Sequence, residues 1–184
     1  DYYAAQNLLK ETYKTIEETS NSEEQVNNNR SRLFWTMMMI QSHNQQKKEA
    51  FESLAQWKKY RKANLDNSNQ RRVDGHNAGN YATEAWMHTL FGNYTKAKTL
   101  LKKHYDITSK WDDPSALDNY NGISGMVYVM EGNPSKALEF FNERISPANY
   151  QYYSYFKALA LKATQNKKAA NDIFNFIANY NFAS

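Results

Sequence analysis

The side chains that could take part in acid–base or metal chemistry are few in this sequence and are spread along it. The chain has four histidines and no cysteine. The lack of cysteine excludes disulfides, thiolate nucleophiles and zinc–cysteine sites. The strict two-histidine zinc motif is absent, and the cluster Asp74-Gly75-His76 lies in a polar stretch that we interpret as a loop with a chance histidine. The histidines are His43, His76, His88 and His104.

Other motifs that would indicate catalysis are also missing. The sequence contains no glycine-rich phosphate loop and no serine nucleophile elbow. Asp112 and Asp113 directly precede Pro114, which is typical of a turn rather than of a catalytic carboxylate pair. We therefore predict no catalytic residue, no metal site and no cofactor, and we expect a protein that is not an enzyme.

The composition favours a single helical domain. The 184 residues include 14 Tyr, 9 Phe and 4 Trp, enough for a sizeable core, but only six Gly and three Pro. No apolar run approaches the roughly 20 residues that cross a bilayer, so no membrane span is predicted. Because the chain begins at Asp1 without Met, it is compatible with a removed leader, and the sequence leaves the compartment open.

The clearest structural pattern is the stretch from Gly125 to Phe141. Gly132 and Asn133 form a helix stop, since glycine adopts the left-handed conformation that ends a helix without steric cost. Pro134 suits the first turn of a second helix. Apolar residues recur at helical spacing on both sides, so the stretch predicts two short helices packed as a hairpin.

Weaker copies of this hairpin occur before and after it. Aligned on the alanine after the turn, the copies contain Ala50, Ala97, Ala137 and Ala170. Four positions after each alanine comes a large apolar residue, namely Leu54, Leu101, Phe141 and Phe174. Twelve positions before each alanine lie Met38, Ala85, Gly125 and Ala158, which are small in three cases of four. The first copy diverges most, since it also has Gln41 where the third copy has Tyr128.

At these positions the chain resembles the tetratricopeptide repeat (TPR) family, whose unit is a helix pair of about 34 residues. The resemblance covers residues 31–184 and implies an all-α fold, a right-handed superhelix (α-α solenoid) of about four TPR-like helix pairs. We expect one domain over residues 1–184, with an N-terminal helix and loop in 1–30 and repeat-like units at 31–64, 78–111, 118–150 and 151–184. Residues 20–29 and 63–79 are predicted as polar loops. An irregular helical bundle is the alternative fold.

The resemblance also implies a function, because the first helix of each pair in such arrays lines a concave groove that holds peptides. Carried over residue by residue, the partner-binding positions are Arg32, Trp35, Met39, His43, Trp86, Met126, Met130, Tyr152, Tyr155 and Lys162. Their aromatic and Met side chains suit an apolar or aromatic-bearing ligand, although the same residues could instead form the core between helices. We expect a non-catalytic module that binds a protein or peptide partner. The alternative is a helical protein that binds carbohydrate or another small molecule as part of a larger secreted system.

The charge pattern raises nucleic-acid binding as a third reading. The chain carries a formal net charge of +4, and residues 43–72 hold eight Lys or Arg against three Asp or Glu. Trp57 and Tyr60 lie among them and could stack on bases. Their helical spacing from Ala50 and Leu54 favours the core instead. We interpret the basic stretch as a solvated helix face and do not expect nucleic acid as the partner.

Overall fold

The structure is a computed structural model that describes residues 2–65, 69–145 and 150–180. Within these ranges it contains nine α-helices, one short 3₁₀ helix and no strand, which confirms the predicted all-α class. The helices fall into two compact units, residues 1–80 and residues 81–184. Each unit has its own set of packed helices.

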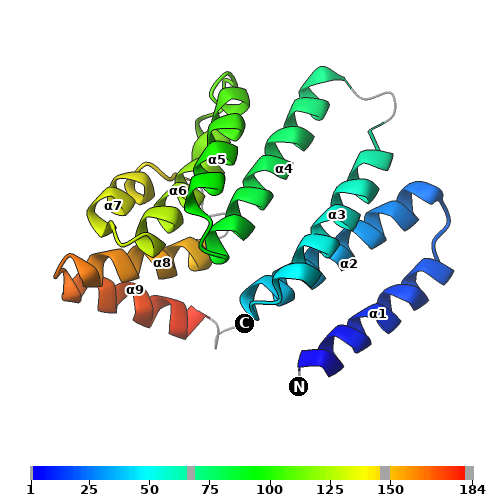
Figure 1. Ribbon diagram of the computed structural model, residues 1–184, viewed down its shortest axis with the longest axis horizontal. Helices are drawn as coiled ribbons and strands as arrows, with labels where there is room; N and C mark the ends of the chain where they lie inside the picture. The colour runs from blue at the N-terminus through cyan, green and yellow to red at the C-terminus, as the bar shows by residue number, and fades with distance from the viewer. Residues whose placement is uncertain (1, 66–68, 146–149, 181–184) are drawn as a thin grey trace. The chain divides into compact units, whose positions relative to one another are not determined.

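In the first unit, α1 (Tyr2–Glu18), α2 (Glu23–His43) and α3 (Lys47–Ala63) follow one another in antiparallel order, and α4 (Gln70–Leu90) begins there (Figure 1). Helix α2 is the central one of the first three, because it packs against both α1 and α3. The apolar residues buried between α2 and α3 include Met37, Met38, Ala50, Leu54 and Trp57.

The loop predicted for residues 20–29 is wrong over most of its length. Helix α2 begins at Glu23, because the Ser22 side chain accepts a hydrogen bond from the backbone N–H of Gln25. Glu23 and Glu24 add negative charge at the positive end of the helix dipole. This polar segment therefore starts a helix rather than separating two helices.

The loop predicted for residues 63–79 is wrong from residue 70 onward, for the same physical reason, and residues 66–68 lie outside the described part of the chain. Helix α4 begins at Gln70, and the Asn69 side chain accepts a hydrogen bond from the Arg72 N–H at 2.9 Å. On this polar first half of α4, His76 and Ala78 are buried. A side-chain cap and a narrow buried face are enough to form the helix here.

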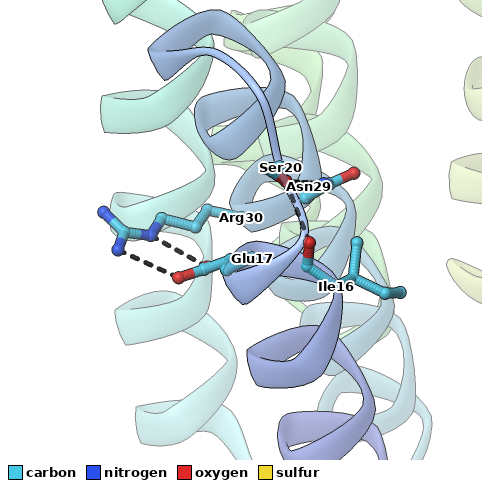
Figure 2. Close-up of polar contacts among 5 residues, drawn as sticks. All are labelled: Ile16, Glu17, Ser20, Asn29 and Arg30. Carbon is cyan, nitrogen blue, oxygen red and sulfur yellow. Dashed lines mark hydrogen bonds and ion pairs between the residues drawn. The ribbon is translucent and has the colours of Figure 1, made fainter.

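Figure 2 shows how the link between α1 and α2 is fixed. The Arg30 guanidinium donates two hydrogen bonds to the Glu17 carboxylate, at 2.9 and 3.0 Å. Beside this ion pair, the Asn29 amide donates to Ser20 Oγ at 3.1 Å, and that hydroxyl donates to the Ile16 carbonyl at 2.9 Å. Two-point pairing by arginine defines an angle as well as a distance, so it orients α1 on α2.

In the second unit, the remainder of α4 is followed by five further α-helices and one 3₁₀ helix. These are α5 (Tyr94–Thr108), η1 (Pro114–Leu117), α6 (Asp118–Met130), α7 (Pro134–Asn142), α8 (Tyr150–Ala163) and α9 (Lys167–Tyr180). Helix α6 packs against α5, α7 and α8, and α8 packs against α7 and α9. Helix α6 is therefore the central element of this unit, and residues 121–127 within it are all buried.

One backbone turn recurs at the four predicted hairpins. In each, a single residue has positive φ: 59° at Gln45, 72° at Gly92, 86° at Gly132 and 66° at Gln165. The next residue donates its N–H to a carbonyl five positions earlier, at 2.8–2.9 Å: Gln46 to Gln41, Asn93 to His88, Asn133 to Tyr128 and Asn166 to Leu161. The turn that the sequence indicated from Gly132 is therefore the same turn in all four places.

The aligned positions of the four hairpins have equivalent burial. The four alanines after the turn, Ala50, Ala97, Ala137 and Ala170, are all 0% exposed. The positions twelve residues before them, Met38, Ala85, Gly125 and Ala158, are also buried. In the last three hairpins, small side chains at both positions let the two helices approach closely, because little volume separates their backbones.

The first hairpin has Gln41 at the aligned position where the third hairpin has an aromatic residue, Tyr128, and the contacts of Gln41 explain this difference. Gln41 is buried, and its amide is within 2.7 Å of the Ser53 hydroxyl of α3 and 3.4 Å of the Gln6 amide of α1. A buried amide must find partners, and α1 and α3 both supply them. An aromatic ring at this position could not make these contacts.

The surroundings of Gly125 show how closely the two helices of the third hairpin approach each other. A Cβ added there would lie 2.6–2.8 Å from three ring atoms of Phe141. We expect Gly125→Ala to lower the free energy of unfolding by about 1–3 kcal/mol, because overpacking outweighs the roughly 1 kcal/mol that alanine gains over glycine in a helix. Urea unfolding measures this change.

The matched control is Gly79→Ala, where an added Cβ would meet only the Arg61 guanidinium, at 3.4 Å or more. This variant should lose no stability. Phe141→Leu should restore part of the stability of Gly125→Ala by shortening the opposing side chain. A Gly125→Ala protein as stable as the wild type would show that the helices are less closely packed than described.

The repeated turn allows a prediction about backbone strain. The residue with positive φ is glycine in two hairpins and glutamine in the other two. A left-handed conformation costs an L-residue about 1–2 kcal/mol, whereas glycine loses roughly 0.5–1 kcal/mol in extra chain entropy on folding. Gln165→Gly should therefore raise the free energy of unfolding by about 0.5–1 kcal/mol, and Gly132→Ala should lower it by a similar amount. Gln165→Ala, which shortens the side chain but keeps the strain, is the control. If it proved more stable than Gln165→Gly, backbone strain would not govern this turn.

Candidate functional site

Four of the predicted partner-binding residues lie along one face of α2. Arg32, Trp35, Met39 and His43 follow each other at intervals of three or four residues, and we refer to them as the α2 stripe. Arg32 and His43 are exposed, Met39 is half-buried, and Trp35 is 38% exposed. The Trp35 ring packs on Trp57 of α3 with centroids 5.4 Å apart, so its exposed edge is held in a fixed position.

Three further predicted residues lie along one face of α8 in the second unit. These are Tyr152, Tyr155 and Lys162, which we refer to as the α8 stripe. Tyr155 is 47% exposed and packs edge-on against Phe156 and against Phe174 of α9, with centroids 5.5 and 6.0 Å away. Lys162 is exposed and Tyr152 is half-buried. The stripe thus offers an aromatic edge and a cation to solvent.

Trp86 and Met126 require a correction. The sequence assigned both to a partner surface, but Trp86 is only 5% exposed and Met126 is fully buried. Both lie on the buried face of their helix, so they support the fold rather than contact a partner. The last predicted residue, Met130, is half-buried near the end of α6, where its carbonyl accepts a hydrogen bond from the Tyr94 hydroxyl at 3.0 Å.

Trp86 and Tyr152, the half-buried member of the α8 stripe, form a part-buried polar contact. The indole N–H of Trp86 donates to the Tyr152 hydroxyl at 2.8 Å, and that hydroxyl lies 3.9 Å from the Met126 sulfur. Burial raises the pKa of Tyr152 to about 12, and the hydrogen bond from Trp86 opposes this rise. Burial also raises the pKa of the neighbouring Tyr153. Both tyrosines are therefore neutral structural groups at physiological pH.

The second unit also contains a tyrosine-lined hollow that sequence reasoning missed. It has a volume of about 290 Å³ and lies between α5, α6 and α7. Tyr105 is 41% exposed at its edge, and its ring centroid is 4.9 Å from that of Tyr120. The Tyr128 ring stacks on Phe140 at 5.4 Å, and Lys98 lies 4.8 Å above the Tyr128 centroid. The sequence signal that could have indicated this hollow is a set of aromatic residues on the second helix of one hairpin (α5) and on the first helix of the next hairpin (α6).

The first unit contains a cavity of about 590 Å³ that sequence reasoning also missed. We call it the basic cavity, because arginines from three helices line it and none of its lining residues in the described part of the chain is acidic. Its lining residues are Asn28, Ser31, Arg32, Arg61, Asn64, Leu65, Arg72, Gly75 and His76. Only Arg32 among them belongs to the predicted partner-binding set.

Comparisons with protein-family models, with curated proteins and with solved structures find no match to this chain. In the part of the chain that the structure describes, no helix is both long enough and apolar enough to span a bilayer. The same residues contain no group of three or more His, Asp or Glu side chains that could hold a metal ion. His88 and Glu84 approach each other at 3.9 Å as an i,i+4 pair on α4.

The raised pKa of Tyr152 predicts a loss of stability in alkali. The unfolded chain ionises this residue near the ordinary tyrosine pKa of about 10, whereas the folded chain keeps its proton up to about pH 12. Between these values the folded state binds more protons than the unfolded state, so the free energy of unfolding falls as pH rises. The contribution is complete below pH 10 and is lost as pH approaches 12.

Urea unfolding across this pH range should show a shallower alkaline decline for Tyr152→Phe than for the wild type. The variant should start from a lower stability at neutral pH, by about 1–3 kcal/mol, because it leaves the buried Trp86 N–H without its acceptor. Equal alkaline slopes in the two proteins would place Tyr152 in a more solvated environment than the structure indicates.

Proposed function

We propose that this chain is a non-catalytic protein-interaction module built from TPR-like helix pairs. The support is the recurrence described above: one left-handed turn in four places, a fully buried alanine after each, and a buried residue twelve positions before it. A repeated hairpin that cannot bury its apolar face alone is typical of helical-repeat proteins. Such proteins bind their ligands on the extended concave surface that successive repeats form.

Within the second unit, we propose that the hairpins stack as a right-handed superhelix of the TPR type. Helix α6 contacts its own partner α7, the preceding α5 and the following first helix α8. Helix α7 also contacts α8. This succession of neighbour contacts supports stacking of one hairpin on the next over an irregular bundle.

The observation that carries the binding proposal is a pair of exposed aromatic residues at equivalent repeat positions. Trp35 and Tyr155 each lie three residues before the aligned buried position of their hairpin, Met38 and Ala158 respectively. The equivalent positions of the two middle hairpins are the small residues Ala82 and Gly122. Large aromatic side chains left partly exposed but held by packing are the residue type that dominates protein–protein binding energies.

The charge of the two stripes indicates what the partner segment carries. Helix α2 has no acidic residue from Arg30 to His43, and α8 has none between Tyr150 and Ala163. Arg32 and Lys162 are exposed on the stripes. We therefore propose a polypeptide segment that combines apolar side chains, which contact Trp35 or Tyr155, with acidic side chains, which face the cations.

A selection of random peptides displayed on phage tests this proposal. The enriched peptides should be rich in acidic and apolar residues, and Trp35→Ala or Tyr155→Ala should weaken their binding at least about tenfold, the effect of losing an interface hot spot. Fluorescence polarisation with the labelled peptides measures the dissociation constants. Both aromatic residues are partly exposed, so circular dichroism should show that the variants remain folded.

Tyr105→Ala is the matched control, because Tyr105 is similarly exposed but lies on α5, the second helix of its hairpin. Its peptide affinity should stay within twofold of the wild type. Loss of binding in Tyr105→Ala with none in the other two variants would assign the site to the tyrosine-lined hollow. That result would contradict the proposal for the two stripes.

A further inference from the structure

The basic cavity of the first unit has a polar lining of which only Arg32 belongs to the α2 stripe. Arginines from three different helices meet there: Arg32 from α2, Arg61 from α3 and Arg72 from α4. They are separated by 29 and 11 positions in the sequence, so only folding brings them to one cavity. Like charges repel, so such a gathering costs stability unless a counter-charge is present.

Arg61 is held in a fixed position at this cavity. Its guanidinium lies 4.4 Å from the Trp57 ring centroid, and one N–H donates to Asn80 Oδ1 at 3.0 Å. Burial lowers the pKa of this guanidinium, although the group remains charged at all physiological pH values. A guanidinium has five N–H donors and the bond to Asn80 uses one, so a stacked, oriented cation remains for a ligand.

Asn80 also fixes the state of His76. Because Asn80 Oδ1 accepts from Arg61, its amide nitrogen is the atom that donates to His76 Nε2, at 3.0 Å. His76 Nε2 is thus an acceptor, and the neutral ring carries its proton on Nδ1. Burial and the charges of Arg61, Lys58 and Lys62 lower the His76 pKa, which agrees with a neutral ring. His76 is therefore a neutral lining residue of the cavity.

Two asparagine side chains, Asn28 and Asn64, also line the cavity. The Asn64 amide donates to Asn28 Oδ1 at 2.8 Å, which links the end of α3 to α2. Arg72 donates to the Asn64 carbonyl at 3.2 Å, which links α4 to the same point. Ser31 lines the cavity from α2 and contributes a hydroxyl. Amides and a hydroxyl are the groups that bind the hydroxyls of a polar ligand.

We propose that the basic cavity binds a small polar molecule through a tetrahedral oxyanion group, a phosphate or sulfate ester. Arginine is the side chain best matched to such a group, because its planar fork donates two parallel hydrogen bonds to neighbouring oxygens. The volume of about 590 Å³ exceeds what an inorganic ion needs and falls in the range of small-molecule sites. The remaining space accommodates the body of the molecule beside Asn28, Ser31 and Asn64.

The surroundings of the cavity favour a small ligand over a polynucleotide. An adjoining hollow shares Asn64 and Arg72 with the cavity, but its other lining residues include Glu23 and Glu24. These carboxylates would repel a chain of phosphates that continued past Arg72. The positive region is therefore bounded, which suits a ligand whose charge is concentrated at one end.

Isothermal titration calorimetry in a phosphate-free and sulfate-free buffer tests the proposal directly. The probes are glucose 6-phosphate, glucose 6-sulfate, inorganic phosphate and, as the neutral reference, glucose. At least one ester should bind, and more tightly than inorganic phosphate, because the sugar adds contacts to the amides. Comparing the affinities of glucose 6-phosphate and glucose 6-sulfate shows which oxyanion the cavity prefers. Glucose alone should give no heat of binding.

Arg32→Gln and Arg72→Gln should each weaken binding of the ester at least about tenfold, the effect of losing a hydrogen bond to a charged group. Both arginines are exposed, so the fold should survive these changes. Arg71→Gln is the matched control, since it removes the same charge from the neighbouring residue of α4, which does not line the cavity. Its affinity should remain within twofold of the wild type.

Three results would overturn the proposal. The first is equal binding of glucose and its esters, or no binding of either ester at millimolar concentration. The second is an equal loss in Arg71→Gln and Arg72→Gln, which would indicate diffuse surface charge. The third is a single-stranded oligothymidylate that binds more tightly than either ester with a steep dependence on salt, which would make the region a nucleic-acid surface. Arg32 belongs to both proposed sites, whereas Arg72 lines the cavity and is not part of either stripe. The Arg72→Gln result therefore separates a failure of this proposal from a failure of the peptide proposal.

Discussion

The hairpins of both units depend on one backbone constraint, the left-handed residue that reverses the chain between paired helices. Because this residue directs the next N–H back to a carbonyl five positions earlier, the turn fixes where the second helix begins. The alanine four residues after that donor then faces the first helix with no exposed surface. Any larger residue there would separate the helices and remove the packing around it. The buried residues follow from this close approach.

The sequence predicted the features that this constraint controls and missed those that polar side chains control. Gly132, Pro134 and Ala137 identified the third hairpin, since glycine, proline and alanine have few other structural roles at that spacing. The starts of α2 and α4 were missed because Ser22 and Asn69 cap helices whose first turns contain no apolar stripe. Met126 was placed on a surface because a helix face alone does not show which neighbour covers it; burial here comes from tertiary packing.

The basic cavity could not be predicted from the sequence, for a different reason. Arg61 and Arg72 were part of a stretch interpreted as a solvated helix face, and only the structure shows that they line one cavity with Arg32 of α2. Trp57 was correctly expected in the core, yet its ring also supports the Arg61 guanidinium. One aromatic residue thus contributes to the interior on one side and orients a cation on another. Helical periodicity in the sequence predicts that Trp57 is part of the core, but it gives no information about the contact of its ring with Arg61.

The neighbour-to-neighbour contacts of the second unit have a consequence for how it folds. Among its described residues, α5 to α9 each pack on a helix adjacent in the chain, and the packing of α6 on α8 skips a single helix. The hydrogen bond from Trp86 of α4 to Tyr152 of α8 is a longer-range contact. Contacts between segments close in sequence need only short loops to close, and chains dominated by them fold within about microseconds to milliseconds. The described residues of this unit include no strand that would need a partner distant in sequence. A newly synthesised chain can therefore complete each hairpin as it emerges, with little time for its apolar faces to meet those of another molecule.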